Sequence, residues 1–429
     1  MTSQTTKPIL PPSLREPLPP ITSVSAGVVF AALVVGLGLG LMLAFSAPDA
    51  LPGVLAVAEP VGELWLRALQ ATIIPLVAAL LFTGIVQTVE AASAGRLARR
   101  SLGWFAAILA GGSAMAVFVT PGLLAALPIP AEAASALRAG LAGAEPGPVP
   151  GFADFLRSII PANVFSAASN DAVLPLILFI TAFALAAMRL PSAQRDALAL
   201  FFRAVAGAML VVIGWVLAAA PVGVFALSLT VAAKSGAAAI SALAHYVLVV
   251  TLVGTVIFVA AYAVAVFAAR QRLGTFARAM LPAQALALST QSSLATMPAM
   301  LLVCRKLGVR EATADFTLPL AVALFRSTGP AMNLAVAIYV AHWFGVALTP
   351  GMLVAGFAVA TLTTLGAVSL PGALSFVTSI GPIALAMGVP VGPLALLVAV
   401  EVLPDLMRTL ANVTMDVAVT AAVDRGESD

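Results

Sequence analysis

Long apolar runs recur along the whole chain and are separated by short segments that contain charged residues, proline or glycine. A helix needs about 20 apolar residues to cross a hydrocarbon core about 30 Å thick, and every backbone N–H and C=O must be paired inside lipid. Unbroken Leu, Val and Ala runs favour helices over a closed barrel. The pattern predicts membrane-spanning helices near residues 22–46, 61–90, 101–125, 172–189, 197–230 and 238–269.

Basic residues mark one side of the predicted membrane. If the N-terminus is cytoplasmic, the following residues all fall on the cytoplasmic side: Lys7, Arg15, Arg96, Arg99, Arg100, Arg189, Arg195, Arg270, Arg272 and Arg278. Cytoplasmic loops carry an excess of Lys and Arg, so this orientation is favoured. It predicts a disordered cytoplasmic tail at 1–21, a polar excursion at 126–160 on the opposite side, and a cytoplasmic tail at 425–429.

The pattern changes after residue 270. Residues 275–308 have positive charge at both ends, and the middle carries the polar stretch 289–298, which includes Ser292 and Ser293. A single span cannot have both ends on the cytoplasmic side, so we predict a re-entrant hairpin. Residues 350–389 repeat the pattern from the opposite side, with the turn at 363–372.

Each predicted hairpin is followed by a further apolar helix, at 311–345 and at 391–424. The two units indicate an inverted repeat, and interrupted helices of this kind mark the binding sites of secondary transporters. The alternative is that both segments are ordinary kinked spans. The predicted fold is an all-α integral membrane protein with eight transmembrane helices and two re-entrant helical hairpins.

The last helix carries the strongest chemical pattern. At about 100° per residue, its polar positions form one stripe, which consists of Glu401, Asp405, Arg408, Thr409, Asn412 and Asp416. Unpaired charges at membrane depth are costly, so this stripe is expected to face the protein interior and to bind a solute or ion. A structural Asp405–Arg408 pair is the alternative, and Glu401, one turn nearer the helix start, is expected to line the entrance.

Composition excludes several other classes of protein. Of 429 residues, 62% are hydrophobic and 9% are charged, with a mean hydropathy of +1.10, whereas soluble domains carry roughly 25% charged residues. The net charge of +3 reflects loop arginines and predicts no nucleic-acid partner. A single cysteine, Cys304, and two histidines exclude a disulfide framework and leave little for a Cys or His metal site.

The run Asp405 to Asp416 resembles the last-helix motif of the dicarboxylate/amino acid:cation symporters, the glutamate transporter family. The similarity extends over nearly the whole chain, and further segments that carry it are 74–76, 160–170, 220–225 and the hairpin serines. It implies an elevator-type fold, in which hairpins and last helices slide against a fixed scaffold, and a homotrimer. Residues 22–270 are then six helices, mainly scaffold and trimerisation with part of the transport domain, and 271–424 are the transport core.

The resemblance also implies site residues. Arg408 matches the arginine that binds the side-chain carboxylate of the substrate, and Asp405 matches the aspartate that binds its amino group. Further substrate contacts are implied at Ser292, Ser293, Ser369, Leu370, Pro371, Gly372, Thr409 and Asn412. Asn412 and Asp416 match sodium ligands; no cofactor other than a coupling ion, sodium or proton, is implied.

The chain departs from the family at one ion site. Where relatives carry an Asn-Met-Asp-Gly-Thr motif, this chain has residues 325–329, Phe-Arg-Ser-Thr-Gly, and a Thr-Ser pair of the third helix is replaced by Gly111-Gly112. A guanidinium, Arg326, has entered the same region. Three interpretations stay open: the charge of Arg326 replaces a sodium ion, Arg326 binds a second substrate carboxylate, or it forms a structural ion pair.

These observations predict a secondary active transporter in the inner membrane that moves an anionic small solute, such as aspartate or glutamate, with a cation. The alternative is a carrier of C4-dicarboxylates or other organic anions with proton or exchange coupling, in which Arg326 replaces sodium. An anion channel is also open. An enzyme is not expected, because the sequence contains neither a serine–base arrangement nor a His-Glu-x-x-His pair suited to an intramembrane hydrolase. The expected partners are the solute, membrane lipid and two further copies of the chain.

Overall fold

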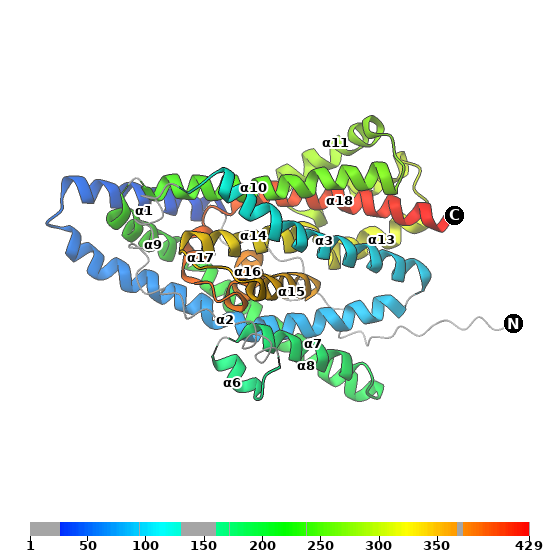
Figure 1. The fold of residues 1–429 in the computed structure, drawn as a ribbon, viewed down its shortest axis with the longest axis horizontal. Helices are drawn as coiled ribbons and strands as arrows, with labels where there is room; N and C mark the ends of the chain where they lie inside the picture. The colour runs from blue at the N-terminus through cyan, green and yellow to red at the C-terminus, as the bar shows by residue number, and fades with distance from the viewer. Residues whose placement is uncertain are drawn as a thin grey trace.

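The computed structural model describes residues 26–93, 95–129, 160–170, 172–236, 238–366 and 372–428, and every element in these ranges is helical. The predicted tail at 1–21 and most of the polar excursion lie outside the described residues, as do Ser369, Leu370 and Pro371. Figure 1 shows that the long helices run roughly along one common direction. An all-helical fold is the one that a chain of these apolar runs was predicted to adopt.

One group of helices packs around the long helix α2. It contains α1 (Ala26–Ser46), α2 (Leu51–Ser93), α6 (Val164–Ser169), α7 (Val173–Ala187), α8 (Ser192–Ala218) and α9 (Ala220–Ser235). Helix α1 packs on α9, while α2 contacts α7, α8 and α9. At about 1.5 Å per residue, the 43 residues of α2 span about 65 Å, so this helix extends well beyond one crossing.

The predicted helix at 197–230 is two helices in the structure. The first ends at Ala218, and the second starts at Ala220 with Pro221 in its first turn. Proline has no N–H and clashes with the preceding turn, so it is tolerated at a helix start but interrupts a helix interior. Pro221 therefore accounts for a boundary that the hydrophobic pattern alone does not reveal.

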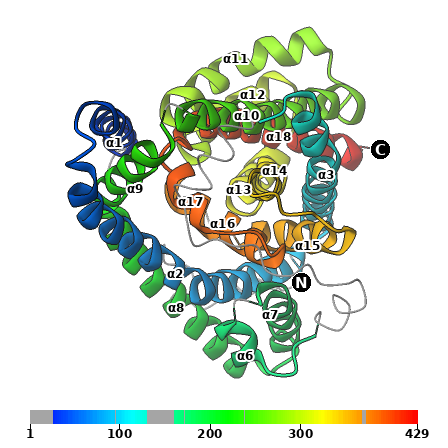
Figure 2. The same ribbon diagram turned by 60° about the vertical axis from the view of Figure 1, so that its left-hand side comes forward.

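A second group encloses helix α14. Its elements are α3 (Arg96–Ala126), α10 (Ala238–Ala263), a π-helical turn (Val264–Ala268), α11 (Leu273–Thr290), α12 (Ser293–Lys306), α13 (Glu311–Leu324), α14 (Thr328–Trp343), α15 (Pro350–Gly366), α16 (Gly372–Ala386), α17 (Gly392–Leu397) and α18 (Val402–Ser428). Figure 2 shows α13 and α14 nearly end-on, with α3, α10, α15, α16, α17 and α18 around them. Contacts of α14 with α3, α10, α15, α16 and α18 agree with this view.

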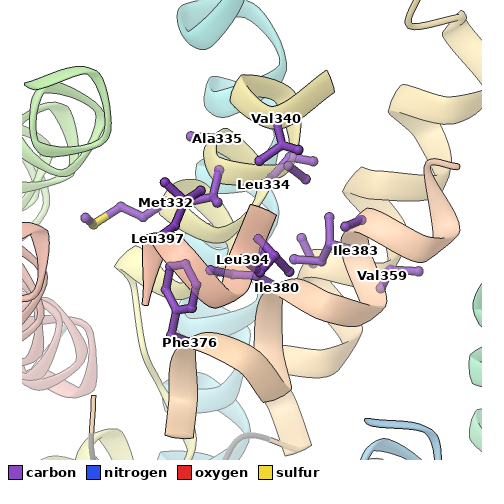
Figure 3. Packing of buried hydrophobic residues seen from close by; sticks show 14 of the residues in the cluster. Met332, Leu334, Ala335, Val340, Val359, Phe376, Ile380, Ile383, Leu394 and Leu397 are labelled. Atoms are coloured by element: carbon purple, nitrogen blue, oxygen red, sulfur yellow. The ribbon is translucent and has the colours of Figure 1, made fainter. Parts of the chain in front are cut away.

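Every residue of α14 is buried except His342. A helix that is apolar on all sides has no polar face to offer to water and is expected inside a bundle. Figure 3 shows the packing of α14 side chains against α15, α16 and α17. The residues that it labels are Met332, Leu334, Ala335, Val340, Val359, Phe376, Ile380, Ile383, Leu394 and Leu397.

Two pairs of consecutive helices pack side by side where hairpins were predicted. Helices α11 and α12 are in contact, as are α15 and α16. The first pair turns at Gln291, which has a left-handed φ of 51°, and at Ser292, whose hydroxyl accepts from Ala295 N at 3.2 Å. The helical pairs are thus present, while their re-entry into a membrane from one side stays a prediction.

Among the described residues, seven helical segments are long and apolar enough to cross a membrane. They are 27–46, 51–93, 96–126, 192–218, 240–268, 311–343 and 402–426. The predicted span at 172–189 appears as α7, which has 15 residues and is shorter than the usual span. The protein is therefore a multi-spanning helical protein by length and composition, and the count of eight spans stays a prediction.

Candidate functional site

The predicted helix at 311–345 is broken in its middle. Helix α13 ends at Leu324, α14 begins at Thr328, and the connecting residue Phe325 is extended, with φ −119° and ψ 107°. The ring of Phe325 stacks on Phe105 of α3, with centroids 4.5 Å apart. The break is therefore held by tertiary packing, and it places Arg326 on irregular backbone inside the helical bundle.

Helix α3 approaches this break closely at the glycine pair. A Cβ built on Gly112 would lie 3.5 Å from the Ser327 carbonyl oxygen, whereas one built on Gly111 would meet nothing within 4 Å. The face of α3 that lacks a side chain at Gly112 therefore lies against the backbone next to Arg326. The two departures from the family pattern, at 111–112 and at 325–329, lie together in space.

Asn412 of α18 closes the N-terminal end of α14. Its Oδ1 accepts three hydrogen bonds, from Ser327 Oγ at 3.0 Å, Thr328 N at 2.9 Å and Thr328 Oγ1 at 3.0 Å. The first N–H groups of a helix lack intrahelical partners, and an Asn side chain is a favourable acceptor for them. Asn412 therefore fixes the broken helix to α18.

The polar stripe of the last helix faces inward, as predicted. Glu401, Thr409, Asn412 and Asp416 are all buried, with at most 7% of the residue exposed. The side chains of Asp405 and Arg408 are 14% and 12% exposed. Because charges at this depth need partners, the contacts of these side chains define the candidate site.

Arg408 is engaged by three groups of the chain itself. Its Nη2 donates to Glu401 Oε1 at 2.7 Å, its Nη1 donates to Asn333 Oδ1 at 2.9 Å, and its Nε lies 3.5 Å from Asp405 Oδ1. A guanidinium carries five N–H donors, so two N–H groups on the terminal nitrogens remain for a ligand. The Asp405–Arg408 pair exists, yet it is one part of a larger network.

Glu401 does not line an entrance, which corrects the sequence-based expectation. It is 2% exposed, one oxygen accepts from Arg408, and the other accepts from Tyr246 Oη of α10 at 3.2 Å. The helical spacing of polar residues gave a wrong expectation for Glu401, because this residue precedes the first residue of α18. Its side chain therefore need not continue the polar stripe of the helix. Tertiary contacts direct it to the arginine.

Asp416 is fully buried, and neither of its carboxylate oxygens has a hydrogen-bond partner among the described residues. A buried carboxylate without donors is rare and requires a bound ion or a nearby charge. Among the described residues, Arg326 is the one cation whose charge stabilises an ionised Asp416, and it also attracts Asp405. Arg326 therefore supplies positive charge to both aspartates.

A small cavity lies at the centre of this network. The free space inside it is enough for about one water molecule. The lining residues are Arg326, Thr328, Gly329, Asn333, Thr364, Ser379, Arg408 and Asn412. Within the described part of the chain, the lining combines two guanidiniums with amides and hydroxyls and includes no carboxylate.

The structure brings together only part of the residues that the resemblance implied. Arg326, Arg408 and Asn412 line the cavity, and Asp405 lies against Arg408 outside the lining. Ser292 and Ser293 do not line it, and Ser292 caps α12 instead. The second helical pair contributes Thr364 and Ser379, while Gly372 begins α16 and residues 369–371 lie outside the described residues.

Sequence reasoning missed Asn333, Thr364 and Ser379. Asn333 is the one amide in α14, an otherwise apolar helix, and an isolated polar residue in a buried apolar segment is a signal that could have identified it. Thr364 and Ser379 have ordinary sequence surroundings. Only the packing of α15 and α16 against α14 places them at the cavity.

The residues predicted to bind sodium fit a cation unequally. Asp416 offers two buried oxygens without hydrogen-bond donors in the described chain, which suits a hard cation. Asn412 Oδ1 already accepts three hydrogen bonds, and this arrangement leaves it no lone pair for an ion. Its Nδ2 is a donor and suits an anion instead.

The chain is similar over most of its length to known transport proteins. A profile of the sodium:dicarboxylate symporter family matches residues 27–426. The chain is 24% identical over 413 residues to the proton/glutamate-aspartate symporter of Escherichia coli K12, covering 92% of this chain and 91% of that protein. It is 26% identical over 404 residues to the proton/sodium-glutamate symport protein of Bacillus subtilis 168, with 93% and 92% covered. It is 25% identical over 405 residues to C4-dicarboxylate transport protein 1 of Pseudomonas aeruginosa UCBPP-PA14, with 94% and 88% covered.

Proposed function

The chain belongs to the sodium:dicarboxylate symporter family, and on that premise we propose that it is a secondary carrier of a small organic dianion, driven by a coupled cation. Relatives named for glutamate, aspartate and C4-dicarboxylate transport support an anionic solute of this size. They leave open whether that solute carries an amino group.

The cavity lining supports a dicarboxylate in particular. Arg326 and Arg408 both face the cavity, and a planar guanidinium is well suited to a carboxylate. The amide nitrogen of Asn412 and the hydroxyls of Thr328, Thr364 and Ser379 are further donors. The presence of two guanidiniums in one small cavity is the observation that carries the proposal.

An acidic amino acid is the second candidate, and Asp405 is the residue that favours it. Asp405 lies one turn from Arg408, where the family resemblance places a partner for an ammonium group. In this structure its carboxylate is 3.5 Å from Arg408 Nε, is acted on by Arg326, and does not line the cavity. Two guanidiniums thus compensate its charge already, which weighs against an ammonium ligand.

The charge of Arg326 supports a coupling scheme that depends less on sodium. The guanidinium of Arg326 attracts Asp405 and Asp416 electrostatically. It is part of the chain, and it supplies the positive charge that a bound sodium ion would bring. A proton, or exchange of one anion for another, is then the driving partner. If sodium does bind, Asp416 is the residue whose oxygens would hold it.

The fold supports an elevator-type carrier in the inner membrane. The helices around α14 contact the α2 group through a limited set of helices, chiefly α15 and α16 on α2. We assign the α2 group to the scaffold and to a homotrimer interface, and α3, α10 to α18 to the moving part. The excess of basic residues on one side supports cytoplasmic positions for both termini.

Uptake into proteoliposomes tests the solute. Labelled succinate is expected to accumulate saturably and to exchange with internal unlabelled succinate, whereas L-aspartate competes about tenfold or more weakly, because its ammonium finds no unpaired acceptor. Arg408→Met is expected to abolish uptake, with the exposed Arg67→Met as the control. Preference for aspartate would favour the second candidate, and flux linear in concentration would show a channel.

A further inference from the structure

Arg408 binds a carboxylate of the chain itself and also lines the cavity in which a solute carboxylate would bind. The Glu401–Arg408 contact is 2.7 Å long, and both partners are nearly buried, at 3% and 12% side-chain exposure. Arg408 lines the cavity, whereas Glu401 does not. A carboxylate that enters the cavity therefore meets an arginine whose charge is already compensated.

With every group in its charged form, the network carries more negative than positive charge before any solute binds. Two guanidiniums, Arg326 and Arg408, face the carboxylates of Glu401, Asp405 and Asp416. A dianion would add two further negative charges in a region shielded from water, where repulsion between like charges is strong. Binding must therefore be accompanied by the uptake of at least one positive charge.

Glu401 is the carboxylate that depends most on Arg408. Asp405 is attracted electrostatically by both guanidiniums, and Asp416 is attracted by Arg326. Glu401 has Arg408 as its only positive partner among the described residues, and its other neighbours are the Tyr246 hydroxyl and the negative Asp405. Withdrawal of Arg408 would leave Glu401 as a buried anion with one hydroxyl donor.

We infer that Glu401 is the proton-binding group of this carrier: the solute carboxylate replaces Glu401 on Arg408, and Glu401 then takes up one proton. No covalent bond in the solute changes. The ion pair of Glu401 with Arg408 is exchanged for one between the solute and Arg408, and a proton from water forms the O–H bond of Glu401. Tyr246 Oη stays within reach of the neutral acid. This inference rests on the proposed function.

The groups that face Glu401 come from three elements. Arg408 and Asp405 lie on α18, Tyr246 lies on α10, and Asn333, which shares Arg408 with Glu401, lies on α14. Of these, only Arg408 is cationic. Because the solute-bound state holds one proton more than the empty state, binding tightens as pH falls, by up to tenfold per pH unit for one proton.

Calorimetry on the full-length protein in detergent tests the inference with succinate and L-aspartate as probes. Titrations in two buffers of different ionisation enthalpy count the protons taken up for each solute bound. Wild type is expected to take up about one proton. Glu401→Gln keeps the shape and an acceptor for Arg408, and it is expected to bind with no proton uptake and no dependence on pH.

Two further variants secure the result. Tyr246→Phe removes a donor to the charged form of Glu401, so proton uptake is expected to persist and to extend to higher pH. Glu311→Gln, at an exposed pair with Arg305, is the matched control and should behave as wild type. Binding without proton uptake in wild type, or uptake retained in Glu401→Gln, would overturn the inference alone. Failure of both probes to bind wild type would overturn the proposed function and the inference with it.

Discussion

Arg326→Met tests whether a guanidinium supplies the positive charge that a coupling ion supplies elsewhere in the family. The substitution keeps a long unbranched side chain and removes the charge that acts on Asp405 and Asp416. Asp405 retains Arg408, whereas Asp416 loses its only positive partner among the described residues and has no hydrogen-bond donor there. The loss of this positive charge therefore destabilises mainly the ionised form of Asp416.

The free-energy cost of the substitution follows from the burial of Asp416. A buried charge that loses its compensating charge costs about 3–5 kcal/mol, which corresponds to roughly two to four orders of magnitude in an equilibrium constant. Asp416 can recover this energy only by taking a cation from water. We expect Arg326→Met to lose uptake in sodium-free medium at neutral pH and to recover part of it with added sodium or at low pH.

Succinate uptake into proteoliposomes with sodium or choline outside, at two external pH values, measures this effect. Wild type is expected to show similar uptake in both salts. Arg67→Met is the control, because its side chain is 77% exposed and its 3.7 Å pair with Glu63 contributes about 0–1 kcal/mol. Uptake unchanged in rate and ion dependence in Arg326→Met would refute the reasoning, as would a strict sodium requirement of wild type.

Two further predictions concern the packing that positions the site. Asn412→Ala leaves the Thr328 N–H at the start of α14 without its acceptor and is expected to destabilise the protein by about 2–4 kcal/mol. Asn412→Asp keeps the acceptor and should retain most of the thermal stability in detergent. Equal melting temperatures of the two variants would contradict the capping role. Gly36→Ala places a Cβ 2.7 Å from the Phe225 carbonyl oxygen, so α1 must move away from α9, at a cost of about 1–3 kcal/mol. Gly38→Ala, with nothing within 4 Å, is its control, and comparable thermal shifts for both glycine variants would show that the α1–α9 contact is not tight.

The sequence could predict the features that depend on local composition. Transfer of a side chain between water and lipid depends mainly on its own chemistry, so apolar runs reveal the membrane class and most helices. The helical pairs at 275–308 and 350–389 could be predicted because polar turns interrupt the apolar runs. The inward stripe from Asp405 to Asp416 was readable because buried charges must avoid lipid.

The break at 325–327 could not be predicted in the same way. No proline or glycine occupies these three positions, and the segment is fixed from outside, by Phe105 on one side and Asn412 on the other. The hydrophobic pattern averages over several residues and reads the segment as continuous helix. The local signal is Pro330 in the first turn of α14, which marks a helix start but does not show how many residues before it leave the helix.

The amino-acid sequence by itself determined that this chain is a helical membrane protein with an inward polar stripe in its last helix. Only the tertiary structure decided which groups that stripe meets: Arg408 binds Asn333, 75 residues away, and Asn412 caps Thr328, 84 residues away. The physical reason is that burial reflects the hydrophobicity of each segment, whereas a hydrogen bond or ion pair requires two atoms within about 3 Å of each other. That distance is set by the packing of helices, which no single segment encodes.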